Sequence, residues 1–294
     1  MSELIDPKTL ATLTDLELAG QIIAQGYLFG RHHGVRLGQG IEFAQYRNWQ
    51  LGEGSRHIDW RRYARSDRLL VRESELETDF RMWLMLDYSA SMQLGSRQGA
   101  LTKSKFSRLL SAALGFLAHR QDDEMGLIGI GADSRVMLPA QSDRNQWYRL
   151  LATLQTLDAE GTIEEADHLP ANLLDTTDGS LIVAISDFYQ HNSEWSLLLE
   201  KLAVGNRDVM AICLECDDEV DFPFEGATRF IDLESGEERL TEPAKVRDAY
   251  RAAREAHITE ARRRLTRTGA SFIRVNIDQP FNLGVILQGH AQHG

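Results

Sequence analysis

Short apolar runs alternate with helical patterns from residue 81 onward. The runs cover residues 82–87, 125–131, 135–139, 181–187, 208–215 and 271–277. Strands that alternate with helices are typical of βαβ units, whose strands pair in parallel. The pattern therefore predicts an α/β domain with three layers and a mostly parallel sheet, in which helices cover both faces.

The clearest helical pattern lies between the first two runs, over residues 102–120. Its apolar positions advance by three, one, three, one and three residues, which makes one stripe on a helix: Phe106, Leu109, Leu110, Ala113, Leu114 and Leu117. Residues 142–156, 192–204 and 244–268 predict further helices. Residues 232–240 predict a hairpin that turns at Ser235 and Gly236.

The chain before residue 81 has a different character. Residues 8–25 predict one helix, and a glycine-rich stretch follows that is typical of loops and short strands. This part lacks the apolar periodicity of an independent domain. We therefore expect residues 1–77 to form an N-terminal extension packed on a main domain of residues 78–294.

Composition and charge narrow the functional class. The chain has 294 residues, of which 43% are hydrophobic and 26% charged, as in a folded globular protein. Its formal net charge of −12 argues against a molecule-wide surface for nucleic acid. No signal peptide or membrane span is predicted, so we expect a cytoplasmic protein; the oligomeric state is left open.

Two predicted strands end at an aspartate, and both loops carry oxygen side chains. Asp87 is followed by Ser89 and Ser91 on alternate residues, and the second strand ends at Asp187. Ligands of open parallel sheets bind beyond the carboxyl ends of the strands, and oxygen donors suit Mg²⁺, or Mn²⁺ in its place. A metal site is therefore predicted here, although the same triplet could simply cap a helix or shape a turn.

The order Asp-x-Ser-x-Ser, then Thr, then Asp resembles the metal-ion-dependent adhesion site of von Willebrand factor A domains. The resemblance implies a domain of that type, with metal-site residues Asp87, Ser89, Ser91, Thr162 and Asp187. It also implies that the hydroxyls contact the ion, that the aspartates act largely through water, and that a partner's carboxylate completes the shell. Other threonines nearby could replace Thr162. The family's usual glycine after the last aspartate is Phe188 here.

Residues 42–75 carry a second resemblance. They are similar to the signature of the bacterial family called domain of unknown function 58, which precedes a von Willebrand-like domain. The matching residues are Arg47, Gly52, Arg56, Ile58, Asp59, Trp60, Ala64, Arg65, Leu70, Arg72 and Glu73. This resemblance implies a partnership with a MoxR-type AAA+ ATPase in the assembly or activation of a client protein.

The same stretch is rich in arginine and aromatic residues, which could indicate nucleic-acid binding. A structural role is favoured, because arginine pairs with acids and stacks on aromatic rings. We therefore assign a structural network that fastens the N-terminal segment, and no nucleic-acid partner, to the signature residues Arg56, Asp59, Trp60, Arg65 and Arg72.

The sequence favours a binding module over an enzyme. The predicted function is a non-enzymatic, Mg²⁺-dependent adaptor; the alternative is a Mg²⁺-dependent phosphoryl-transfer or hydrolytic enzyme that uses Asp87. Such phosphatases place a second aspartate where this chain has Ser89, and no lysine follows in an obvious motif. A phosphate-binding P-loop and a serine-hydrolase elbow are absent as well. Cys213 and Cys216 are predicted to be two reduced thiols in or beside a strand.

Overall fold

The computed structural model describes residues 5–30, 43–48, 70–74, 80–95, 101–131, 135–159, 180–189, 194–204, 207–233 and 235–291. Its contacts divide the chain into two units, one of residues 1–34 with 81–294 and one of residues 35–80. This division differs from the expected boundary after residue 77. The first helices belong with the sheet, whereas the signature stretch forms a unit of its own.

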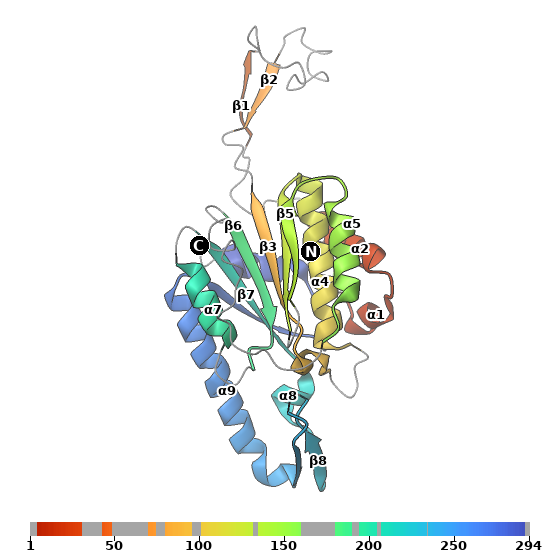
Figure 1. Ribbon diagram of the computed structural model, residues 1–294, viewed down its shortest axis with the longest axis vertical. Helices are drawn as coiled ribbons and strands as arrows, with labels where there is room; N and C mark the ends of the chain where they lie inside the picture. The colour runs from red at the N-terminus through yellow and green to blue at the C-terminus, as the bar shows by residue number, and fades with distance from the viewer. Residues whose placement is uncertain are drawn as a thin grey trace. The chain divides into compact units, whose positions relative to one another are not determined.

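A six-stranded sheet forms the centre of the larger unit (Figure 1). Its strands are β3 (Arg81–Asp87), β4 (Glu124–Ile130), β5 (Arg135–Gln141), β6 (Ser180–Ser186), β7 (Asp208–Glu215) and β10 (Ser271–Asn276). They lie in the order β10-β7-β6-β3-β4-β5, and every pair is parallel except β4 with β5. Numbered along the chain, this is the doubly wound order 3-2-1-4-5-6. The predicted mostly parallel α/β sheet is confirmed.

Helices cover both faces of the sheet, which gives three layers (Figure 1). Trp83 and Met85 of β3 belong to a core cluster with residues of α7 (Glu194–Ala203) and α9 (Pro243–Arg267). The opposite face of the sheet is covered by α4 (Lys103–Gln121) and α5 (Gln146–Thr156). Side chains alternate along a strand, and β3 is buried on both sides. Its apolar run therefore has no polar alternation.

The predicted helix of residues 8–25 is wrong in one respect, because the chain forms two helices there. They are α1 (Pro7–Thr12) and α2 (Leu16–Gly30). The break falls before Asp15, whose carboxylate accepts hydrogen bonds from the backbone N–H groups of Glu17 and Leu18 and so caps α2. Helix α2 packs closely on α4, since a Cβ atom at Gly20 would lie 3.0 Å from Ala112.

The predicted hairpin is present between β8 (Thr228–Ile231) and β9 (Glu238–Thr241). Its turn uses Gly236, whose φ of +71° favours glycine. Three short elements were not predicted: the 3₁₀ helix η2 (Ala90–Gln93), α8 (Asp217–Asp221) and α10 (Leu283–Ala291). The first two immediately follow strands at the carboxyl edge of the sheet.

The smaller unit contains a two-stranded antiparallel ribbon of β1 (Phe43–Asn48) and β2 (Leu70–Ser74). Arg72 of the signature lies in β2, opposite Tyr46 in the register. The other four residues of the predicted structural network lie outside the described residues: Arg56, Asp59, Trp60 and Arg65. The network therefore stays a prediction.

No helix within the described ranges combines the length and the apolar character needed to cross a bilayer.

Candidate metal-ion site

Asp87 and Asp187 follow two neighbouring parallel strands at the point where the strand order reverses. Asp87 is the last residue of β3, and Asp187 comes directly after β6, which pairs with β3. Ligands of doubly wound sheets bind at such a point. Both side chains are buried, with exposed fractions of 2% and 0%. Topology thus brings together two acids that are one hundred positions apart in the sequence.

Ser89 and Ser186 donate hydrogen bonds to the carboxylate of Asp87. Its Oδ1 atom accepts hydrogen bonds from the backbone N–H of Ser89 at 2.9 Å and from the Ser89 hydroxyl at 2.7 Å. Its Oδ2 atom accepts one from the Ser186 hydroxyl at 2.6 Å. Ser89 also precedes the first residue of η2. The aspartate therefore shapes the turn after β3, as the alternative reading proposed, and also orients the Ser89 hydroxyl.

Ser89 and Ser91 present their hydroxyls side by side. The two Oγ atoms lie 3.1 Å apart. Ser89 is fully buried, whereas Ser91 is partly exposed. Because the Ser89 hydroxyl can donate to Asp87, its lone pairs are left for another ligand. The pair of hydroxyls forms the outer part of the site.

Burial is the main cause of an unusual pKa at Asp87. Desolvation and the nearby charge of Asp187 raise the pKa of Asp87 to about 7, while the hydrogen bonds from Ser186 and Ser89 act in the opposite direction. Desolvation is therefore the largest influence on this carboxyl group, ahead of the charge of Asp187. A cation placed beside it would favour its ionised form.

Lys103 supplies the only ammonium group that the described residues show at these acids. It is fully buried at the start of α4, and its Nζ atom donates to Asp187 Oδ2 and Glu219 Oε1, each at 2.7 Å. Burial alone lowers the pKa of Lys103, but Asp187 and Glu219 more than reverse this and raise it. The second oxygen of Asp187 accepts from the backbone N–H of Tyr189 at 3.2 Å.

Sequence reasoning missed Lys103, Glu219 and Ser186. Lys103 is separated by 84 positions from Asp187 and by 116 from Glu219, so no local motif joins them. The helix pattern gave no signal for Lys103, because Lys105 and Arg108 follow in the same helix. Ser186 lies directly before Asp187 and was taken only as a strand residue.

The described residues fit a hard divalent ion. Asp87, Ser89 and Ser91 offer oxygen ligands, and the serine hydroxyls are needed because no cluster of three or more His, Cys, Asp or Glu side chains that could hold a metal is found within the described ranges. Among the described residues, Lys103 pairs with Asp187 and Glu219, and Asp87, whose pKa is raised to about 7, is a third buried acid beside them. Adjacent ligands of an octahedral Mg²⁺ ion lie about 3.0 Å apart, close to the spacing of the two serine hydroxyls.

Thr162, the fifth predicted metal-site residue, lies outside the described residues. The chain is described as far as Ala159, whose carbonyl accepts a hydrogen bond from Gln93 Nε2 of η2. Ala159 is therefore anchored to the 3₁₀ helix that contains Ser91. The part of Thr162 in the site stays a prediction.

Phe188 takes the place where the adhesion-site family usually has glycine. Its φ is +59°, a left-handed conformation that favours glycine. The ring is 98% buried and lies 5.3 Å from Phe272, and the Phe188 carbonyl is 2.6 Å from His257 Nε2. Such a conformation costs about 1–3 kcal/mol and persists where the surroundings hold it. The loop thus keeps a turn suited to glycine, and packing around the ring stabilises it.

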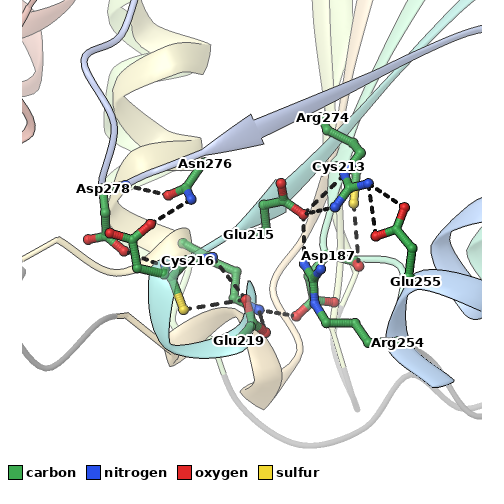
Figure 2. Close-up of polar contacts among 12 residues, drawn as sticks. Asp187, Cys213, Glu215, Cys216, Glu219, Arg254, Glu255, Arg274, Asn276 and Asp278 are labelled. Atoms are coloured by element: carbon green, nitrogen blue, oxygen red, sulfur yellow. Dashed lines mark hydrogen bonds and ion pairs between the residues drawn. The ribbon is translucent and has the colours of Figure 1, made fainter. Parts of the chain in front are cut away.

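Polar contacts continue from the site along the carboxyl ends of β7 and β10 (Figure 2). Glu215 accepts hydrogen bonds from Arg254 at 2.6 Å and from Arg274 at 2.9 Å, and Arg274 also pairs with Glu255. These two bases and two acids balance in charge.

The two cysteines are free and buried, as predicted. Cys213 lies in β7 and donates weakly to the Asp187 carbonyl, whereas Cys216 caps α8 and contacts Glu219 (Figure 2). Burial, followed by the charge of Glu219, raises the pKa of Cys216 to about 12. Neither thiol is activated for redox chemistry at neutral pH.

Comparison with known proteins finds sequence relatives and fold neighbours. An uncharacterized protein of Mycobacterium tuberculosis is 27% identical over 286 residues, which cover 96% of this chain and 89% of that protein. Its counterpart in Mycobacterium bovis matches equally well.

Solved structures resemble the chain more distantly. The conserved hypothetical protein BatB from Bacteroides thetaiotaomicron has a TM-score of 0.46 at 15% identity, over 73% of this chain and 96% of that one. The SpRpn10 VWA domain has a TM-score of 0.36 at 13% identity, over 70% of this chain and 93% of that one.

A family model matches residues 45–260, which is more than half of the chain and joins the signature stretch to the sheet that carries the site. The chain therefore belongs to the family described as protein of unknown function DUF58.

Proposed function

We propose that this protein is a non-enzymatic adaptor that binds a partner through a Mg²⁺ or Mn²⁺ ion held beside Ser89 and Ser91. The observation that carries the proposal is the pair of hydroxyls 3.1 Å apart, one of them partly exposed, next to the buried carboxyl groups of Asp87 and Asp187. When bound, the ion would supply an electrophilic position for a partner's carboxylate.

Each residue of the site would have a distinct part in holding the ion. Ser89 and Ser91 would offer hydroxyl lone pairs. Asp87 would fix the Ser89 hydroxyl and supply negative charge, and Lys103 would hold Asp187 in place from behind. Both oxygens of Asp187 already accept hydrogen bonds, which agrees with a role through water. Thr162 is proposed as the remaining hydroxyl ligand.

The proposed partner is a MoxR-type AAA+ ATPase, with a client protein whose assembly or activation the pair would assist. This part rests on the resemblance of the signature and of the Asp-x-Ser-x-Ser motif, and no ATP-binding P-loop occurs in the chain itself. ATP hydrolysis would accordingly be performed by the partner.

One observation bears on the enzyme alternative. A phosphoryl-transfer enzyme would need a lysine near its nucleophilic aspartate, and Lys103 lies in this region. Its ammonium group is fully buried and donates to Asp187 and Glu219. Asp87, the required nucleophile, holds three hydrogen bonds and has no second carboxylate two residues on. The adaptor is the function that this arrangement supports better.

Metal binding tests the proposal first. Electron paramagnetic resonance measures free Mn²⁺, and the loss of this signal on adding protein should show one bound ion per wild-type chain. Added Mg²⁺ should displace the bound Mn²⁺. Ser89→Ala and Ser91→Ala should each weaken binding at least tenfold. Ser111→Ala is the matched control for Ser89→Ala, because this serine is equally buried and its hydroxyl has no hydrogen-bond partner among the described residues. Equal Mn²⁺ binding by all four proteins would refute the site.

Partner binding is the second test. Purified chain should retain a purified MoxR-type ATPase in Mg²⁺ buffer and release it in chelator, and the two serine variants should retain little. If the ATPase is retained equally in chelator and by the serine variants, its binding does not depend on the metal site. Turnover of a phosphate ester above background, lost in Asp87→Ala, would instead support the enzyme.

A further inference from the structure

The β8–β9 hairpin and its supports form an arm at the carboxyl edge of the sheet. The arm consists of α8, residues 222–227, the hairpin and the N-terminal part of α9, and Figure 1 shows it extending beyond the ends of the central strands. It follows directly from β7, and Lys103 ties its α8 to Asp187 through Glu219. The arm is thus fixed to the candidate metal site by a buried ion pair.

The inner face of the hairpin is firmly held. The ring of Phe230 in β8 lies 5.3 Å from Phe222 and 5.0 Å from Phe224, and Phe222 lies 4.4 Å from Tyr250 of α9. Arg247 of α9 also donates to the carbonyls of Phe222 and Phe224 at 3.0 and 2.9 Å. An isolated hairpin is only marginally stable in water, so these contacts explain why this one forms.

The outer face of the same hairpin sets exposed apolar side chains beside the ion pair of Arg229 with Glu238. Ile231 and Leu240 project from this face as diagonal neighbours, because Leu240 pairs with Arg229 and Ile231 with Glu238. Their exposed fractions are 51% and 75%, and Leu233 in the turn is 48% exposed. Large apolar side chains that are exposed to water on a well-supported hairpin are typical of an interaction site.

The hairpin also offers strand edges and a strong charge. In the part of the chain that the structure describes, β8 and β9 pair only with each other, so each has one unpaired edge. Such an edge can accept an added strand. Residues 225–242 contain six acids and two arginines, a net charge of 2 − 6 = −4, and Lys245 pairs with the last of these acids, Glu242. This charge repels acidic segments and attracts basic ones.

We propose that this hairpin binds an extended, apolar and basic segment of a partner protein by adding it as a third strand. The proposal rests on the proposed adaptor function, in which the hairpin is a second contact beside the metal ion. Apolar side chains of the segment would cover Ile231 and Leu240, and its basic side chains would face the acids of the hairpin.

Fluorescence anisotropy with defined peptides tests the proposal on the full chain. The probe is a labelled eight-residue peptide that alternates valine and lysine; its comparators are a valine–glutamate peptide and a peptide of the same valine and lysine content in two blocks. We expect only the alternating basic peptide to bind well. Hydrogen exchange should slow within residues 228–241 when it binds.

Variants that keep the charge of the hairpin show whether the peptide binds at its outer face. Ile231→Gln with Leu240→Gln should raise the dissociation constant at least tenfold, which equals about 1.4 kcal/mol. Val285→Gln is the matched control, because this valine is 62% exposed on α10. Equal binding by the hairpin variant, or equal binding of the block peptide, would overturn the proposal.

Two further outcomes separate this proposal from others. Peptide binding should persist in chelator and in Ser89→Ala, so a failure of the metal site would leave it intact. If sedimentation shows a dimer of the wild type that Leu240→Gln abolishes, the hairpin binds a second copy of this chain, and the proposed basic segment is refuted.

Discussion

Replacement of Lys103 by Met removes one charge from a sealed ion cluster and should strongly destabilise the fold. The ammonium group is fully buried and donates to Asp187 and Glu219 at 2.7 Å each, so its loss strands two carboxylates without a cation. Removal of one partner from a buried ion pair costs about 3–5 kcal/mol. Met fills most of the same volume, so little of this loss comes from an empty cavity.

Urea denaturation followed by tryptophan fluorescence measures this effect. The free energy of unfolding of Lys103→Met should fall by about 3–5 kcal/mol. The control Lys245→Met should fall by less than about 0.5 kcal/mol, because that lysine pairs with Glu242 in a surface ion pair. Adding Glu219→Gln to Lys103→Met should restore part of the loss. A Lys103→Met protein within about 1 kcal/mol of the wild type would show that water or another group compensates the acids, and the argument for a sealed cluster would fail.

Three other changes test other parts of the structure by the same denaturation assay. Burial and an adjacent carboxylate raise the pKa of Asp123 to about 7. The folded state therefore binds the proton of the Asp123 carboxyl group more tightly than the unfolded state does. The contribution of this proton binding to stability is lost as the pH rises from about 4 to about 7. The free energy of unfolding of Asp123→Asn, relative to that of the wild type, should rise by about 1 kcal/mol from pH 5 to pH 8. This value is reduced for solvent screening because the group is half-buried. A relative free energy that does not change over this range would refute the pKa shift. Phe188→Gly should be about 1 kcal/mol more stable than Phe188→Ala, since only glycine accepts the φ of +59° freely, although both lose the buried ring. Gly126→Ala should cost about 1–3 kcal/mol, because its Cβ would lie 2.5 Å from the Trp83 ring, whereas Gly289→Ala meets only an ordinary contact at 3.5 Å and should not destabilise.

Local periodicity in the sequence predicted most of the sheet unit. The strand at residues 82–87 and the helix at 102–120 lie within one or two residues of β3 and α4, because each is a continuous pattern set by one buried surface. The N-terminal helix was predicted as one element because its leucines continue across the break. The Asp15 carboxylate, which starts a new helix, was not recognised as a cap. Helix α10 was missed although Leu283, Ile286 and Leu287 follow helical spacing and are buried.

In the candidate site, too, residues positioned by local contacts could be predicted and those positioned by distant contacts could not. The turn of Asp87 with Ser89 could be found, because its two hydrogen bonds run between residues two apart. The bond from Ser186 could not, because it joins residues 99 positions apart. The place of Lys103 could not, because nothing in a helix pattern says which loops its first residue will meet. A buried lysine costs free energy unless its charge is paired. Its position therefore depends on Asp187 and Glu219, which only the doubly wound topology brings to the same edge.

This dependence links the site to the arm. Glu219 belongs to the helix that precedes the β8–β9 hairpin, and Asp187 to the loop beside the proposed ion, and the same ammonium group holds both. A displacement of α8 would strand a carboxylate inside the protein, which is as unfavourable as removal of the lysine itself. The hairpin and the ion site should therefore keep a fixed separation. A partner that presents an acid to the ion and a basic strand to the hairpin would then meet a preformed surface, and the free energy of ordering that surface would already be provided by folding.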